Sequence, residues 1–379
     1  MSSPYHPGPG ADWAKADPAS AGFDPEGLEA AIDYAKTHET SWSRDIRSQL
    51  IAGLFEPPPY NEIIGPVEPR GGPNGIVLKG GRIVAEWGET NRADMTFSAA
   101  KSYISLTAGL AVDRGLIPSI DAPVRDLVRD GGFEPPHNHA ITWRHLLTLT
   151  SEWEGTLWDK PDLIDRNRNL ATEGGSALKG KHRDLKPPGR YWEYNDVRVN
   201  RLALALLRVW RRPLPEVLKE KVMDPIGASS DWRWHGYRNS TVEIDGQPMQ
   251  SVSGGGHWGG GMFISSRDHA RVGLLMARSG LWQGRRLISD AWIQSSLEPS
   301  PLNPSYGLMW WLNGPGQQWP SAPRSSFAAV GAGQNLLWVD PEHDLVAVVR
   351  WIDKAHADGF LARLLGALRL SAVGRVSAA

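Results

Sequence analysis

Residues 96–107 read Thr96-Phe97-Ser98-Ala99-Ala100-Lys101-Ser102-Tyr103-Ile104-Ser105-Leu106-Thr107, with a serine and a lysine at the start of a strongly apolar run. Ser98 and Lys101 are three residues apart, so a helix would place both side chains on one face. A serine hydroxyl is a weak nucleophile until a base takes its proton, and a lysine is such a base when its surroundings favour the neutral amine. The stretch therefore predicts a buried helix, ended by Gly115, that carries a serine nucleophile and a neutral lysine base in its first turn.

A second Ser-x-x-Lys pair, Ser176 and Lys179, occurs further along the chain. It lies in a polar, Gly-rich segment with no apolar helix behind it. This composition is typical of a solvated surface loop, so we take only the first pair as a candidate site.

The 379-residue chain has an ordinary globular composition, with 41% hydrophobic and 22% charged residues, which suffices for one large domain or two. Its net charge of −1 and pI of about 6.8 imply no broad basic surface, which argues against nucleic acid or a membrane as the main partner. The absence of cysteine excludes disulfides and thiolate catalysis. We see no secretory signal and no run of membrane-spanning length, and expect a soluble cytoplasmic protein acting on a small molecule.

Strand patterns occur in the first and last thirds of the chain. Two apolar runs flank Gly80-Gly81, and two more flank a polar turn in the last third, so both regions predict β-hairpins. The predicted hairpins span 76–87 and 336–351, a further strand spans 306–312, and helices span 23–38 and 359–370.

The middle of the chain carries helical patterns between long Pro- and Gly-rich loops. These patterns cover 144–149, 198–210 and 215–222. We therefore predict an α/β fold with an antiparallel sheet flanked by helices, built from residues 1–116 and 257–379, and a mainly helical domain inserted at 117–256. A cleft at such a junction is a common place for a site.

Tyr194 lies at the entry to one of these helices, at the end of Pro188-Gly189-Arg190-Tyr191-Trp192-Glu193-Tyr194. A phenol near a lysine can pass a proton between a nucleophile and a leaving group. A packing role is the alternative for an aromatic residue in such a half-buried place.

The order of these motifs resembles the serine β-lactamase-like hydrolases. Ser-x-x-Lys at a helix start is followed by Pro-Gly-x-x-Trp-x-Tyr before a helix, and then by a Gly-rich strand ahead of Val339-Asp340-Pro341-Glu342. The chain is most similar to the class C-like branch, with its esterases, D-aminopeptidases and 6-aminohexanoate-dimer hydrolases, from about Phe23 to Leu370. The resemblance implies a β-lactamase/transpeptidase-like fold.

The resemblance also implies roles for individual residues. Ser98 corresponds to the acylated nucleophile, Lys101 to its base and Tyr194 to the proton shuttle. The backbone N–H of Ala332, with that of Ser98, would form the oxyanion hole. No metal or organic cofactor is implied.

Two positions depart from the family pattern. Asp196 stands where the family usually has asparagine, which would put a carboxylate near the substrate. Ala329 stands where a lysine or histidine would bind an acidic substrate. The missing cation argues against carboxylate-bearing β-lactams and favours a neutral ester, or an amide with a positively charged neighbour.

Other residues are candidates for substrate contacts on weaker grounds. His257 and Trp258 lie in a Gly-rich stretch, and Trp153 could line an aromatic-walled pocket. A purely structural histidine is an equal alternative for His257. The spacing of the glycines around it matches a dinucleotide fingerprint, but no βαβ unit surrounds it.

These observations predict a serine hydrolase that forms an acyl-enzyme at Ser98. A carboxylesterase is the first expectation, an amidase of the 6-aminohexanoate-oligomer or D-amino acid type the second, and a weak β-lactamase the third. A non-catalytic, penicillin-recognising binding protein is the alternative of another class. The sequence leaves the substrate and the oligomeric state open.

Overall fold

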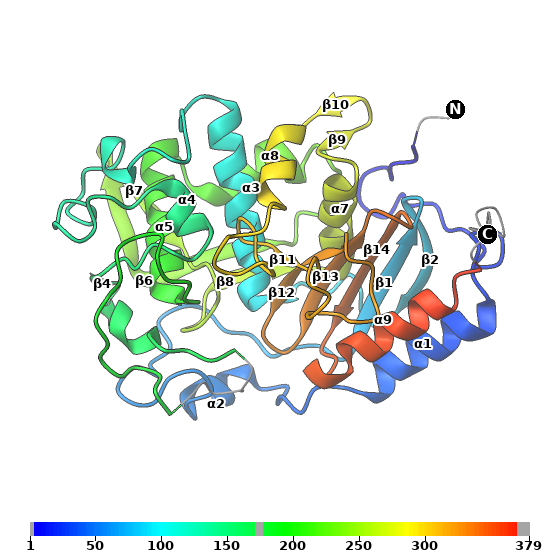
Figure 1. Cartoon of the computed structure of the whole chain (residues 1–379). Coiled ribbons are helices and arrows are strands. Elements are labelled where there is room, and N and C mark those ends of the chain that lie inside the picture. The colour runs from blue at the N-terminus through cyan, green and yellow to red at the C-terminus, as the bar shows by residue number, and fades with distance from the viewer. Residues whose placement is uncertain (1–3, 171–176, 370–379) are drawn as a thin grey trace, which may run out of the picture.

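The computed structural model describes residues 4–170 and 177–369, and its centre is a six-stranded antiparallel sheet (Figure 1). The strand order is β11-β12-β13-β14-β1-β2, so strands from the first third of the chain pair with strands from the last. Their bounds are β1 Asn74–Lys79, β2 Arg82–Trp87, β11 Trp311–Leu312, β12 Phe327–Gly331, β13 Asn335–Asp340 and β14 Leu345–Arg350.

Both hairpins of this sheet are the predicted ones. Gly80 and Gly81, at φ of 60° and 83°, form the turn between β1 and β2, and these angles favour glycine. β1 is buried on both faces, which explains its continuous apolar run. The strand predicted at 306–312 is reduced to β11.

Helices cover the two faces of the sheet. Val77 packs in one core cluster with α1 (Pro25–Thr37) and α9 (Ala357–Gly366), whereas Ile76 packs in the other with α3 (Ala100–Asp113) and α7 (Ser266–Ala277). Figure 1 shows α1 and α9 side by side below the sheet and α7 behind it. The helix predicted after Ser98 is confirmed as α3.

The middle of the chain contains the predicted helices and also a hairpin that we did not expect. The helices are α4 (Trp143–Leu147), α5 (Asp196–Trp210) and α6 (Leu214–Leu218), which continues as a π-helical turn at Lys219–Met223. The hairpin consists of β6 (Arg233–Ile244) and β7 (Gln247–Val252). Asp245 and Gly246, both at positive φ, form its turn, and this Asp-Gly pair was the overlooked signal.

This hairpin belongs to a second sheet of order β3-β8-β6-β7, with β3 at Asp94–Met95 and β8 at Gly261–Ile264. The insertion predicted as mainly helical, residues 117–256, thus also contains the strands β6 and β7. The two-domain division itself stays a prediction.

Arg350 ties the two sheets together close to Ser98. Its guanidinium, fully buried, donates to the carbonyls of Met95 (2.7 Å) and Ile264, and its Nε donates to Asn335 (2.8 Å). These bonds fix β3, the strand from which the chain enters the Ser98 turn.

The remaining short elements lie around these sheets. They are α2 Ile46–Ile51, β4 Thr156–Leu157, β5 Lys160–Pro161, β9 Leu281–Trp282, β10 Arg285–Arg286, α8 Asp290–Ser296 and short 3₁₀ turns at Phe97–Ala99, Val124–Asp126, Asp162–Asp165 and Lys354–His356. Within residues 4–170 and 177–369, none of the helices has the length and apolar character needed to cross a bilayer.

Candidate active site

Ser98 lies in a 3₁₀ turn, Phe97–Ala99, that leads directly into α3. Phe97 before it has φ of 47°, a left-handed conformation that is uncommon for a bulky residue. Aromatic contacts with Trp42 and Phe55, at centroid distances of 5.4 and 6.0 Å, hold the Phe97 ring. The turn presents Ser98 at the N-terminal end of α3, where the helix dipole favours negative charge.

Lys101 points at Ser98, as the spacing predicted. Its Nζ lies 2.8 Å from Ser98 Oγ, and the residue is only 1% exposed. The two groups are thus within proton-transfer distance in a nearly dry site.

The predicted neutral state of Lys101 is not the resting state. Its Nζ also donates to Asp196 Oδ1 at 2.6 Å. Burial, the largest single effect, would lower the pKa of Lys101, but the attraction of Asp196 and Tyr194 and the hydrogen bond to Asp196 together outweigh burial and raise it. Asp196 keeps its own pKa well below the usual range despite its burial, because Lys101, His257 and Arg168 surround it. The ammonium–carboxylate form therefore dominates near neutral pH.

Asp196 is a partner of this lysine rather than a residue of the substrate cavity. It occupies the first turn of α5 and is 1% exposed. Asn195 caps this helix, with its side chain accepting from the N–H groups of Val197 and Arg198. The predicted substrate contact by Asp196 is thus corrected, because its carboxylate faces Lys101 in the interior.

Gly255 leaves the space in which Lys101 and Asp196 meet. A Cβ atom at this position would lie 2.1 Å from Asp196 Oδ1 and 2.9 Å from Lys101 Nζ. Asp196 has little room to move away from an added methyl group, because Arg168 and His257 also contact its carboxylate.

We expect Gly255→Ala to lower kcat by about 100-fold, because a shift on the order of 1 Å at a reacting group has this cost. The measurement is steady-state hydrolysis of a p-nitrophenyl ester. Gly366→Ala, at the end of α9 with open space around it and no left-handed backbone, is the control. Equal losses of activity in the two variants would contradict the steric argument.

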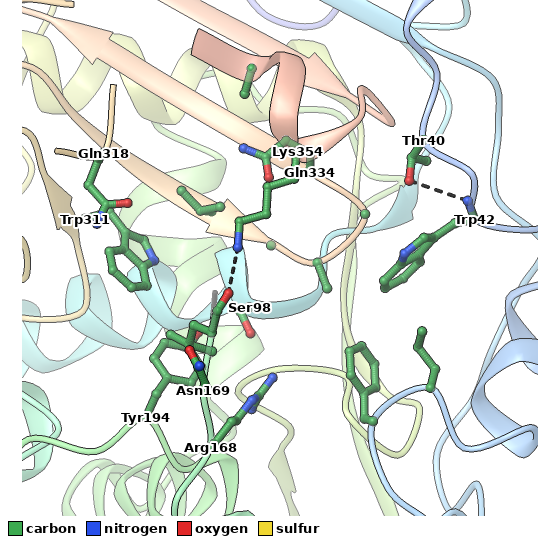
Figure 2. A pocket seen from close by; sticks show the side chains of 18 of the residues that line it. Thr40, Trp42, Ser98, Arg168, Asn169, Tyr194, Trp311, Gln318, Gln334 and Lys354 are labelled. Atoms are coloured by element: carbon green, nitrogen blue, oxygen red, sulfur yellow. Dashed lines mark hydrogen bonds between the residues drawn. The ribbon is translucent and has the colours of Figure 1, made fainter. Parts of the chain in front are cut away.

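Tyr194 lines the same cavity as Ser98. Its ring centroid lies 4.7 Å from Lys101 Nζ and 5.2 Å from the guanidinium carbon of Arg168, and it stacks on Trp311. Figure 2 shows Tyr194 and Arg168 below Ser98. The motif in the sequence predicted that Tyr194 lies near Lys101, and in the structure its ring is beside this lysine.

The cavity above Ser98 has a volume of about 680 Å³, and its walls combine aromatic side chains with polar and charged ones (Figure 2). The aromatic residues that line it are Trp42, Phe55, Trp192, Tyr194, Trp311 and Trp319. These rings suit an apolar part of a substrate, while Arg168, Lys354 and Asp358 place charged groups on the same walls.

The end of β12 forms the wall beside the serine. Val330, Gly331 and Ala332 line the cavity together with Ser98. A Cβ on Gly331 would lie 1.9 Å from the carbonyl oxygen of Thr96, so only glycine permits this approach. The oxyanion role of the Ala332 and Ser98 N–H groups stays a prediction, with both residues at the cavity.

Three other predicted contact residues lie away from the cavity. Ala329 is buried in the core, with Val330 taking its place at the cavity wall. Trp153 donates to the carbonyl of Gly132, and Trp258 donates to that of Tyr60. The alternation of strand β12 explains the first case, and burial explains the other two.

His257 is buried behind the lysine pair. Its Nδ1 lies 3.2 Å from Asp196 Oδ2, and its Nε2 lies 2.7 Å from Glu56 Oε1. His257 is therefore a member of the charged interior and does not line the cavity.

The sequence reasoning missed several charged residues of the site. Arg168 contacts Asp196, and Lys354 reaches into the cavity, where its Nζ donates to the carbonyl of Leu170 at 2.6 Å (Figure 2). The cavity thus holds cations other than the one missing at Ala329, and the expectation of a neutral ester or a cationic amide stays a prediction. No motif signalled Arg168, in a loop, or Lys354, in the 3₁₀ turn Lys354–His356, because both lie outside the motifs that the sequence analysis used.

Lys179 also departs from its expected surface position. Its side chain is 8% exposed and contacts Glu56, while its Nζ lies 3.2 Å from Asp165 Oδ1. Ser176 lies outside the described residues. The polar composition of the segment correctly indicated a loop but could not show that its lysine turns inward.

Glu56, Asp165 and His257 offer ligand atoms within 4.8 Å of one another, a spacing compatible with a metal ion. The ammonium of Lys179 contacts both carboxylates and already supplies the compensating positive charge. This donor set therefore fits a protein cation better than a metal.

Comparisons with known proteins agree on one family. A family model described as Beta-lactamase matches residues 75–365. The 6-aminohexanoate-dimer hydrolase of Paenarthrobacter ureafaciens is 23% identical over 305 residues, covering 72% of this chain and 70% of that protein.

Solved structures show the same fold. A family VIII carboxylesterase superimposes with a TM-score of 0.58 at 16% identity, covering 91% of this chain and 97% of its own. A penicillin-binding protein homologue from Caulobacter crescentus gives 0.55 at 17% identity, covering 91% and 97%. The predicted β-lactamase/transpeptidase-like architecture is thus confirmed. From the match over most of its length and the shared fold, the chain belongs to the beta-lactamase family.

Proposed function

We propose that this protein hydrolyses carboxylic esters through an acyl-enzyme on Ser98. The observation that carries the proposal is the 2.8 Å contact between Lys101 Nζ and Ser98 Oγ at the floor of an aromatic-walled cavity. A paired nucleophile and base beside a substrate-sized cavity is the arrangement that acyl transfer requires.

The proton steps follow from the charge on Lys101. In the fraction of molecules that has lost a proton to solvent, the neutral amine accepts the proton of Ser98. Oγ then bonds to the carbonyl carbon, and the oxyanion meets the Ser98 and Ala332 N–H groups. The carbon–oxygen bond to the alcohol breaks, with Tyr194 passing the Lys101 proton to the leaving oxygen. Water then adds to the acyl carbon and gives up a proton to the same pair of side chains. The bond to Ser98 Oγ breaks, Ser98 regains its proton, and the acid is released.

An ester fits this site better than an amide. Asp196 keeps most Lys101 in the ammonium form, so little neutral base is present near pH 7. An ester carbonyl is more reactive and its leaving group departs more readily, so it demands less of a scarce base. The raised pKa of Lys101 also implies that kcat/KM increases as the pH rises through the alkaline range.

An amidase is the second candidate. The 23% identical relative is named 6-aminohexanoate-dimer hydrolase, which points to a linear amide. The ammonium of Lys101 is also a ready proton donor for an amine leaving group.

A substrate panel tests the proposal. We expect turnover of p-nitrophenyl esters at least 100-fold faster than of 6-aminohexanoate dimer or a chromogenic cephalosporin. Intact mass during turnover, followed by peptide mapping, should show an acyl group on Ser98. Faster amide turnover would favour the second candidate, and absence of both turnover and adduct would favour a binding protein.

A further inference from the structure

Six buried side chains behind Lys101 form a closed ring of ion pairs, which we call the charge ring. Its members in order are Asp196, His257, Glu56, Lys179, Asp165 and Arg168. Arg168 closes the ring, because its Nη1 contacts both Asp165, at 3.3 Å, and Asp196. Lys101 joins the ring from outside through Asp196.

Acidic and basic side chains alternate around the charge ring. Each ring nitrogen of His257 faces a carboxyl oxygen. Carboxyl groups therefore occupy every second position, with a basic side chain between each two. The Asp165 carboxylate also accepts the backbone N–H of Asp196 at 2.7 Å, which anchors the start of α5 to the ring.

Burying so many charged side chains costs free energy, so stabilisation of the fold alone does not explain the charge ring. Five of the six side chains are at most 8% exposed and Arg168 is 13% exposed. Apolar residues of similar volume often stabilise a fold as well as a buried ion-pair network or better. The ring members come from distant parts of the chain, and two of them, Arg168 and His257, contact the carboxylate that holds Lys101.

We propose that the charge ring is a positioning device for Lys101, in which Glu56 and Lys179 act on Lys101 through Asp196, although Lys179 also lines the cavity beside Ser98. This inference rests on the proposed function of Ser98. Glu56 and Lys179 touch neither Ser98 nor Lys101. They orient the Asp196 carboxylate and set the electrostatic potential that Lys101 experiences from behind, while Tyr194 and Arg168 face it from its other sides.

The test uses variants of opposite charge effect on the full-length protein. The readout is the rate of Ser98 phosphonylation by a fluorophosphonate probe, measured by intact mass across the pH range. The rate should rise with pH as Lys101 loses its proton, and we call this part of the pH–rate profile the rising limb. Glu56→Gln removes a negative charge, so Lys101 loses its proton more easily and the rising limb should move to lower pH by about one unit. Lys179→Met removes a positive charge and should move the limb to higher pH. Lys179→Arg should restore the wild-type position.

The plateau rate should fall about tenfold in Glu56→Gln, because Asp196 loses one of its supports. Asp130→Asn is the matched control, since Asp130 is a buried carboxylate paired with Arg201 and Arg208 on α5, away from Lys101. It should lower stability without moving the limb. A limb that stays in place in both ring variants, or moves in the same direction in both, would overturn the proposal.

A second measurement separates this proposal from that of function. If the wild type neither hydrolyses esters nor reacts with the probe, the proposed function fails, but the ring can still be tested by unfolding. Each of Glu56→Gln and Lys101→Met changes the unfolding equilibrium constant by some factor. In the double variant, the change should differ by at least about threefold from the product of these two factors. Simple multiplication of the two effects would contradict coupling through the ring.

Discussion

Ser98→Ala is expected to lower kcat/KM for p-nitrophenyl esters by a factor on the order of 10⁴ or more. The substitution removes the atom that bonds to the carbonyl carbon and leaves Lys101 with no hydroxyl to deprotonate. Ser98 is only partly buried and faces the cavity, so the free energy of unfolding should change little. Stopped-flow or steady-state release of p-nitrophenol measures the first effect, and denaturant titration measures the second.

Ser102→Ala is the matched control for this experiment. Ser102 lies one turn along α3, is buried, and donates to the carbonyl of Met309 at 2.7 Å. Its loss should cost about 1 kcal/mol of stability and leave turnover within a few-fold of the wild type. Equal rates for the wild type and Ser98→Ala would remove Ser98 from the reaction.

Lys101→Met is expected to reduce kcat by about 10³-fold and to abolish the rise of activity at alkaline pH. The lysine is the only side chain within 3 Å of Ser98 Oγ among the hydrogen bonds of the described residues, so no other group there can replace it. Asp196 keeps its contacts with Arg168 and His257, which limits the loss of stability to about 1–3 kcal/mol. A pH–rate profile and a denaturant titration give the two quantities.

Lys160→Met controls for the loss of a buried lysine as such. Lys160 is 4% exposed and lies over the rings of Trp258 and Tyr60, at 5.6 and 5.9 Å, outside the cavity lining. Its replacement should leave the pH–rate profile unchanged. If Lys101→Met retained the alkaline rise, the base would have to be sought elsewhere, first at Tyr194.

The features that the sequence predicted are those encoded by neighbouring residues. The three-residue spacing brought Ser98 and Lys101 together, and Gly80-Gly81 marked the turn of the first hairpin. The β6–β7 hairpin escaped because its residues are mostly polar and partly exposed, so its alternation is weak, although Asp245-Gly246 marks its turn.

The charge on the site depended on contacts that no local pattern encodes. Glu56 and Asp196 are 140 positions apart, and both contact His257. A polar loop composition predicts that a lysine such as Lys179 is exposed to water. It does not predict that Glu56 and Asp165 lie beside this lysine in the folded chain. The motif position of Ala329 likewise indicated a missing cation, while Lys354 enters the cavity from the 3₁₀ turn Lys354–His356.

The pairing of β1 with β14 has a consequence for how the chain acquires its fold during synthesis. Strand β1 has its partner on one side near residue 85, but on the other side only when residues 345–350 have left the ribosome. Until then one edge of β1 has no hydrogen-bonding partner, and the sheet that packs against α3 is incomplete. Completion of the enzyme must therefore follow translation of nearly the whole chain, and the serine turn acquires its wall, β12, at the same late stage.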